Sequence, residues 1–195
     1  TTLLKTLAGL RRPGRGRVTW DGDEVARLPP EARRERQSSF GMVFQTDALF
    51  DSSTVLENVL VPLRHRRVPD EEAQQRALAA LEQVGIAHAA HQLPDALSGG
   101  MRKRAGIARA LVARPEVLLA DDPLAGLDPG TGSKIARLLL EVSRGRTLIV
   151  ALPDPVPWFP LPRWVLLEEG RLGYDGPFDP QRLDRTEVPP PPASP

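Results

Sequence analysis

Two neighbouring stretches of the chain hold residue types that suit the binding of phosphate and of a divalent cation. Residues 98–100 are Ser-Gly-Gly and open an amphipathic helix that we predict over residues 102–113. Glycines at a helix start let backbone N–H groups approach an anion, which the helix dipole also favours. An apolar run, predicted as a buried strand over residues 116–121, ends in the carboxylates of Asp121 and Asp122. Because α/β sheets place ligands at the carboxyl ends of their strands, this region is predicted to carry phosphate chemistry.

Three motifs in this region resemble those of the ATP-binding subunit of ABC transporters. Residues 97–104 are Leu-Ser-Gly-Gly-Met-Arg-Lys-Arg, residues 117–122 are Val-Leu-Leu-Ala-Asp-Asp, and residues 125–128 are Ala-Gly-Leu-Asp. By this resemblance they are the signature motif, the Walker B strand with its Mg²⁺-holding Asp121, and the D-loop. The resemblance implies an α/β fold of the P-loop NTPase type, an ABC nucleotide-binding domain with a helical subdomain, and the cofactors ATP and Mg²⁺. It implies that Thr1, Thr2, Gln45, Ser98, Gly99, Gly100, Asp121 and Asp128 bind the nucleotide, with Thr1, Gln45 and Asp121 at the metal.

The first ten residues resemble the helix that follows a phosphate-binding loop. The full loop motif is G-x-x-x-x-G-K-[ST], and by resemblance Thr1 is its last residue, whose hydroxyl binds Mg²⁺. The loop's glycines and lysine, together with the first strands of the domain, are expected to precede residue 1. We therefore interpret the sequence as truncated within the loop. The alternative is an ordinary N-capped helix.

Three further positions bear on hydrolysis. Gln45 follows a strand predicted over residues 40–44; the family glutamine there contacts Mg²⁺ and the attacking water, although a strand-end glutamine is often only a surface residue. Asp122 stands where the family usually has a glutamate base, and its arm is one methylene shorter. Pro153 stands where the family has a histidine, and the prolines of residues 153–162 disfavour a helix. The expected catalytic residues are Gln45 and Asp122, and hydrolysis is expected to be slow.

Periodicity and turn residues divide the chain into four parts. We predict a first part of a RecA-like core over residues 1–45, a helical subdomain over 46–97, the signature helix, Walker B and the rest of the core over 98–186, and a Pro-rich disordered tail over 187–195. One helix, from residue 54, is expected to be interrupted near Pro62, and another, over 70–84, to bury a stripe of Leu78, Leu81 and Val84. Other predicted elements are a strand and turn over 17–22, a short helix within 28–36, a helix over 132–143, a strand over 147–152, and a hairpin of 164–168 with 171–174.

Composition bounds the class of protein. The 195 residues are 41% apolar, enough for one compact domain, and the formal net charge of +1 gives no argument for a nucleic-acid partner. No cysteine is present, so nothing requires disulfides. No apolar run approaches the roughly 18 residues of a membrane span. The resemblance and the composition together predict a peripheral protein on the cytoplasmic face of the inner (plasma) membrane.

The segment after Gln45 suggests a subfamily and a partner. Residues 48–52 are Ala-Leu-Phe-Asp-Ser, similar to the Mla/Mce lipid-transport ATPases, so transport of (phospho)lipid is expected. The implied partners are an integral-membrane permease and a second nucleotide-binding subunit, across which Ser98, Gly99 and Gly100 would act in trans. The residues expected to line the groove for the permease are Leu49, Phe50, Val55 and Val59.

Two other functions stay open at this point. Asp122 and Pro153 favour a catalytically degenerate subunit that acts as a structural or regulatory partner. A soluble ABC ATPase of repair or translation is the third possibility. Phe50, likewise, would pack inside the domain if it had no docking role.

Overall fold

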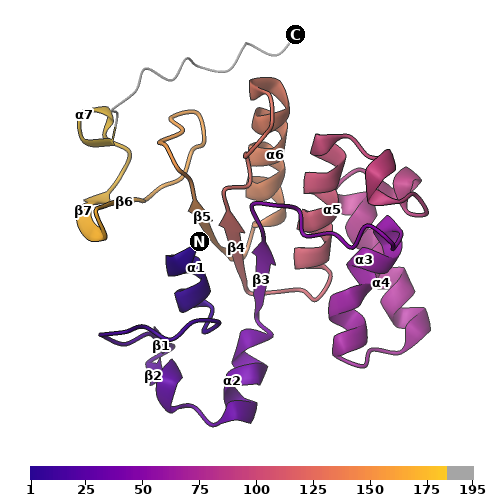
Figure 1. The fold of residues 1–195 in the computed structure, drawn as a ribbon, viewed down its shortest axis with the longest axis horizontal. Helices are drawn as coiled ribbons and strands as arrows, with labels where there is room; N and C mark the ends of the chain where they lie inside the picture. Colours follow the sequence, from indigo (N-terminus) through magenta and orange to yellow (C-terminus); the bar gives the residue numbers. More distant parts are fainter. Residues whose placement is uncertain (184–195) are drawn as a thin grey trace.

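A three-stranded parallel sheet lies at the centre of the computed structural model, which describes residues 1–183 (Figure 1). Its strands are β3 (Phe40–Val43), β4 (Val117–Asp121) and β5 (Thr147–Ala151), in the order β3-β4-β5. Val43 pairs with Ala120, and Asp121 pairs with Ala151. The two strands that flank β4 in the sheet, β3 and β5, therefore end close to Asp121, at the same edge of the sheet.

Helices cover both faces of this sheet, which is why β4 is apolar without alternation. Leu119 points to one face and packs with Leu4 and Ala8 at helix α1 (Thr2–Leu7). Leu118 and Ala120 point to the other face and join the main core with helices α5 (Gly99–Leu111) and α6 (Pro129–Val142).

Helix α5 lies directly against the β3 backbone. A Cβ atom at Gly41 would come within 2.4 Å of the carbonyl oxygen of Ala110, so only glycine permits this approach. The sheet and α5 are thereby held in one fixed relation, and α5 carries the signature residues at its start.

Helices α3 (Val55–His65), α4 (Asp70–Gln83) and α5 pack together at one side of the sheet (Figure 1). Helix α3 starts at Thr54, whose side chain and that of Glu57 form a capping box. The expected interruption near Pro62 is wrong: α3 continues through it to His65. Val59 and Leu63, on either side of the proline, are fully buried, and their packing outweighs the one backbone hydrogen bond that proline removes.

The apolar stripe predicted on α4 is wrong at one position. Leu81 and Val84 are fully buried, but Leu78 is 40% exposed. Alanines supply much of the buried face, and their short side chains let α4 approach its neighbours closely. These alanines are Ala73, Ala77 and Ala80.

The chain between β5 and the next hairpin has no helix over residues 153–162, as the prolines there predict. It nevertheless packs against the domain, because Phe159 is fully buried in the main core. The Phe159 N–H donates to the Val156 carbonyl at 2.9 Å, and Trp158 lies over α6 near Gly132. Residues 153–162, called the strap below, therefore lie across the N-terminal part of α6.

The remaining elements lie at the periphery (Figure 1). Helix α6 starts three residues earlier than the predicted residue 132, because Asp128 caps it. The predicted hairpin around Gly170 is present. These elements are β1 (Thr19–Trp20), β2 (Asp23–Glu24), η1 (Val25–Arg27), α2 (Pro30–Gln37), η2 (Ala87–Ala89), η3 (Pro94–Ala96), β6 (Trp164–Glu168), β7 (Arg171–Gly176) and α7 (Pro180–Leu183).

Two predictions made from the whole sequence are not tested by the described residues. The expected tail at residues 187–195 lies outside the described residues, and the four-part division of the chain stays a prediction.

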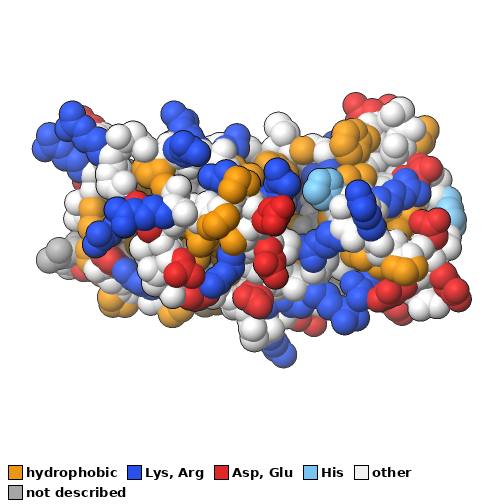
Figure 2. All heavy atoms as spheres, turned by 90° about the horizontal axis from the view of Figure 1, so that it is seen from below, with side chains coloured by type: hydrophobic (Ala, Val, Ile, Leu, Met, Phe, Trp, Pro, Cys, Tyr) orange, Lys and Arg blue, Asp and Glu red, His pale blue; other side chains and the backbone are white. Residues whose placement is uncertain are grey.

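Within residues 1–183, no helix combines the length and the apolarity that crossing a membrane requires. On the face shown in Figure 2, Lys and Arg side chains are interspersed with Asp and Glu.

Candidate functional site

Thr1 and Asp121 lie together at the carboxyl edge of the sheet. The Thr1 hydroxyl donates a hydrogen bond of 2.5 Å to Oδ2 of Asp121, and the Thr1 backbone nitrogen lies 3.0 Å from Oδ1. Asp121 is buried at the end of β4, and Leu4 and Ala8 hold α1 against the same strand. Thr1 and Asp121 are therefore in direct contact, although they are 120 positions apart in the sequence. The resemblance assigns both residues to the metal.

Gln45 and Asp122 form a second pair at this edge. The Gln45 side-chain amide donates to Oδ2 of Asp122 at 3.2 Å. Asp122 has a backbone φ of 43°, a left-handed conformation that aspartate tolerates better than most residues. Its N–H donates to the Ala151 carbonyl at 2.8 Å, which fixes this turn to β5. The two residues predicted to be catalytic thus face each other.

The oxygen atoms gathered here suit Mg²⁺. This cation prefers hard oxygen ligands and usually takes one or two carboxylates together with phosphate oxygens and water. Thr1 offers a hydroxyl, Gln45 an amide and Asp121 a carboxylate. Among residues 1–183, no group of three or more His, Cys, Asp or Glu residues is arranged to enclose a metal by itself. A hydroxyl, an amide oxygen and a carboxylate are oxygen ligands of the kind that Mg²⁺ takes together with phosphate oxygens and water.

The signature residues lie at the start of α5, beside the D-loop. The Ser98 hydroxyl accepts from the Met101 N–H at 3.3 Å and so caps the helix. A Cβ atom at Gly100 would come within 2.9 Å of the Thr131 side chain, so this glycine is required by the packing of α5 on α6. Gly99 lies close to Leu127 of the D-loop. Packing alone thus accounts for Gly100, and the nucleotide roles of Ser98, Gly99 and Gly100 stay predictions.

Asp128 caps the next helix. Its Oδ1 accepts from the Thr131 N–H at 3.0 Å, and the Thr131 side chain and backbone together hold the pKa of this carboxyl below its ordinary value. The carboxylate is therefore ionised at neutral pH. Thr2 is the first residue of α1, and its carbonyl accepts from the Thr6 hydroxyl at 2.8 Å. For both residues the structure gives a local role, and binding of the nucleotide stays a prediction.

The structure contradicts the groove predicted for the permease at two of its four residues. Val55 and Val59 are fully buried and cannot contact a partner. The helix predicted from residue 54 is present, but both valines lie on the face of α3 that packs into the core. Leu49 is half-buried and packs against the core. Phe50, by contrast, is 55% exposed, so the alternative that it packs inside the domain is not what the structure shows.

A buried asparagine holds the loop that carries Phe50. Asn58 is fully buried, and its Oδ1 accepts from the Phe50 N–H at 2.7 Å. Its amide nitrogen lies within hydrogen-bonding distance of the carbonyl oxygens of Phe50, Ser53 and Thr54. Asn58 is not among the residues predicted from the sequence; its one signal there is a polar residue between the apolar positions of α3.

Replacing Asn58 with alanine is expected to lower the free energy of unfolding by about 2–3 kcal/mol, because the loop's N–H and carbonyl groups would lose their buried partner. Urea unfolding followed by circular dichroism measures this. Gln92→Ala, at an exposed side chain, is the control and should change the midpoint little. An Asn58→Ala variant as stable as the parent would contradict the role given to this residue.

The fold is a parallel sheet with helices on both faces and a helical insert between β3 and β4. Its carboxyl edge carries Thr1, Gln45, Asp121 and Asp122. These features define a nucleotide-binding domain of the P-loop NTPase class. The family model of ABC transporters, ABC_tran, matches residues 1–125, and the chain belongs to this family.

Relatives in this family have names of import proteins. The chain is 40% identical over 189 residues to the phosphonates import ATP-binding protein PhnC of Alcaligenes faecalis, covering 91% of this chain and 68% of that protein. It is 40% identical over 152 residues to the methionine import ATP-binding protein MetN of Corynebacterium jeikeium, covering 77% of this chain. The chain spans 41% of that MetN. These names give no support to the expected Mla/Mce subfamily.

Solved structures agree with the fold. The structure of cbiO1 from Clostridium perfringens, described as part of the ABC transporter complex cbiONQ, matches with a TM-score of 0.80 and 32% identity over 90% of this chain and 71% of that one. A dimeric post-hydrolysis state of the ATP-binding cassette MJ0796, bound to ADP and Pi, matches with a TM-score of 0.79 and 32% identity, over 90% and 79%.

Proposed function

We propose that this chain is the ATP-binding part of an ABC importer of a small polar solute, and that ATP binding and hydrolysis at the sheet edge drive the transport. The observation that carries the proposal is the convergence of Thr1 and Asp121 with Gln45 and Asp122 at one edge of the sheet, in a chain of this family. The solute class is suggested by relatives named for the import of methionine, phosphonates, and molybdate or tungstate.

Each residue of the site then has a chemical task. Thr1 and Asp121 would hold Mg²⁺, and Gln45 would orient the attacking water toward the phosphate. Asp122 is the base for that water, which its contact with the Gln45 amide at 3.2 Å supports. Mg²⁺, when bound, neutralises charge on the phosphate oxygens. Pro153 offers no hydrogen-bond donor after β5, so hydrolysis is expected to be slow.

Transport of lipid is the second candidate. The observation that favours it is the Ala-Leu-Phe-Asp-Ser sequence at residues 48–52, which resembles that of the Mla/Mce ATPases. A degenerate subunit that assists another ATPase is a further alternative, and Asp122 and Pro153 favour it. The identity of the permease that co-purifies with this protein from its own cells distinguishes the importer from the lipid transporter.

The proposed partners are a permease in the inner (plasma) membrane, at whose cytoplasmic face the chain would lie, and a second nucleotide-binding subunit. Two subunits would enclose two ATP molecules, with Ser98, Gly99 and Gly100 of each acting on the nucleotide of the other. The dimeric state of the cassette MJ0796 bound to ADP and Pi supports this arrangement.

Light scattering tests the proposal. The chain, extended before Thr1 by a segment that ends in G-x-x-x-x-G-K and carrying Asp122→Asn to block hydrolysis, should dimerise when Mg²⁺ and ATP are added. Adding Ser98→Arg, which places a bulky side chain at the start of α5, should abolish the dimer while leaving the monomer folded. Dimers that form equally with and without ATP, or that survive Ser98→Arg, would count against the proposed function.

Phe50 provides the prediction for the membrane partner. Phe50→Ala is expected to weaken co-purification with the permease, because a buried aromatic anchor at an interface often contributes about 2 kcal/mol or more. The melting temperature of the isolated domain should change little, because the ring is 55% exposed. Leu78→Ala is the matched control, because Leu78 is also an exposed apolar side chain but lies on α4, away from the loop of Phe50. A large drop in melting temperature with intact co-purification would assign Phe50 to the core.

A further inference from the structure

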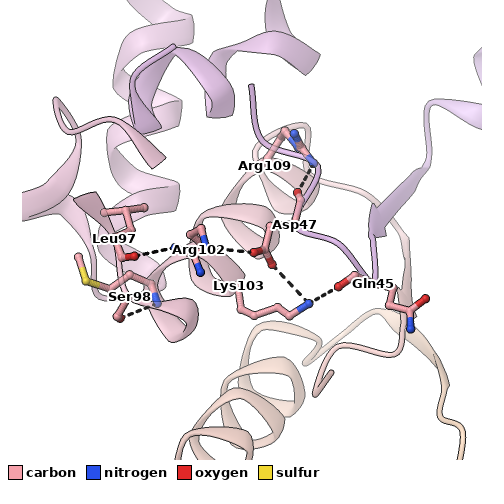
Figure 3. A network of polar contacts seen from close by, with 8 residues as sticks. Gln45, Asp47, Leu97, Ser98, Arg102, Lys103 and Arg109 are labelled. Atoms are coloured by element: carbon pink, nitrogen blue, oxygen red, sulfur yellow. Dashed lines mark hydrogen bonds and ion pairs between the residues drawn. The ribbon is translucent and has the colours of Figure 1, made fainter. Parts of the chain in front are cut away.

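A network of charged side chains joins the loop after Gln45 to the signature helix (Figure 3). Lys103, on α5, is only 4% exposed, and its ammonium donates to the backbone carbonyl of Gln45. The same ammonium lies 3.3 Å from Oδ1 of Asp47, an oxygen that is itself buried. A buried ammonium is costly unless it is paired and hydrogen-bonded, so these two contacts account for its presence here.

Asp47 also contacts the start of the helix. Arg102 Nε lies 3.6 Å from Oδ2 of Asp47, while Arg102 Nη1 donates at 2.8 Å to the carbonyl of Leu97, just before the signature serine. Asp47 is thus in contact with two consecutive cations of α5, one of which holds Gln45 and the other the turn that precedes Ser98.

Arg109, two helical turns further on, fixes the far side of the same loop. Its guanidinium donates to the Asp47 carbonyl at 2.9 Å and to the Ala48 carbonyl at 2.5 Å. Ala48 has a backbone φ of 50°, a left-handed conformation that is unfavourable for alanine and persists only where surrounding contacts impose it. Burial lowers the pKa of Arg109, and the charge of Asp47 acts in the opposite direction.

We propose that Lys103 and Asp47 are positioning residues for Gln45, and that they tie the orientation of its side chain toward Asp122 to the position of helix α5. The proposal rests on the proposed function for its consequence, because α5 also presents Ser98 to the nucleotide of the other subunit. A shift of α5 at one nucleotide would then move Gln45 at the other. None of these residues needs to touch nucleotide.

The neighbouring Arg104 offers a matched control. Its Nη1 donates at 2.5 Å to the Val84 carbonyl at the end of α4, so it holds α5 to the helical subdomain without contacting the Gln45 loop. Arg104→Met and Lys103→Met both remove one long cation from adjacent positions of one helix. Only the second removes a contact with Gln45 and Asp47.

Spin labelling tests the proposal on the 195-residue chain in the absence of nucleotide. The chain has no cysteine, so Thr46→Cys, at an exposed position next to Gln45, gives one label site. We expect Lys103→Met to make the label roughly twofold or more faster in rotation, as local contacts that order the loop are lost. Arg104→Met should leave the label spectrum unchanged while it lowers the melting temperature.

Equal label spectra in the parent and Lys103→Met proteins would overturn the proposal, as would equal loosening by Lys103→Met and Arg104→Met. If Lys103→Met does not fold, Asp47→Asn, which keeps the loop nearly isosteric, decides in its place by the same two comparisons. Because the measurement uses no ATP, it stands even if the proposed ATPase function fails.

Discussion

A double variant with Pro153→His and Asp122→Glu is expected to hydrolyse ATP roughly 10²-fold faster than the parent, when both carry a segment before Thr1 that ends in G-x-x-x-x-G-K. Asp122 is fixed to β5 by its N–H bond of 2.8 Å to the Ala151 carbonyl, two residues before Pro153. The two substitutions therefore act at one corner of the site. Histidine restores a donor toward the phosphate, and glutamate extends the base by one methylene.

Phosphate release at saturating ATP measures this prediction. The single variants show which change matters, and melting temperatures show whether all four proteins are equally folded. Asp122 tolerates its left-handed φ of 43° better than glutamate would, so Asp122→Glu alone is expected to lower stability slightly. Equal turnover in the parent and the double variant would mean that the departures at these two positions are harmless.

Removal of the Phe159 ring is expected to lower the free energy of unfolding by about 3–5 kcal/mol. The ring is fully buried in the main core and anchors the strap between β5 and β6. Phe159→Ala would leave a cavity beneath a proline-rich chain that has few backbone donors with which to close it. Urea unfolding at a fixed pH, with the change in slope recorded, gives the value.

Leu172→Ala is the control for Phe159, because Leu172 is 63% exposed on β7 and its truncation should cost little. A loss of less than about 1 kcal/mol for Phe159→Ala would show that the strap contributes little to the core. In that case the segment between β5 and β6 would not be held to the domain by this ring.

The residues at the carboxyl edge of the sheet were predictable from the sequence, because the ends of apolar strands can be located in it. Gln45 follows one apolar run and Asp122 follows another, and parallel strands that are neighbours in a sheet end at the same edge. Their contact at 3.2 Å, across 77 residues of chain, is a consequence of that topology. The contact of Thr1 with Asp121 follows in the same way, once α1 is placed on the sheet by Leu4.

The network of Lys103 and Asp47 was not predictable by the same route. Both residues lie in segments whose charged side chains would ordinarily face solvent, and the ion pair forms because the packing of Gly41 against Ala110 brings α5 onto β3. Val55 and Val59 were misassigned for a related reason. A few apolar residues after Gln45 do not show which side faces the core until the cap at Thr54 sets the rotation of α3.

The central claim is that the edge formed by Thr1, Gln45, Asp121 and Asp122 binds Mg²⁺ and ATP together. Calorimetric titration of ATP into the chain extended by G-x-x-x-x-G-K, with and without Mg²⁺, tests it most directly. We predict binding that depends on Mg²⁺ and that Asp121→Asn weakens about tenfold or more, while the 195 residues alone, without the loop lysine, bind far more weakly. Affinity that is the same in the parent and in a folded Asp121→Asn variant, or the same with and without Mg²⁺, would contradict the account.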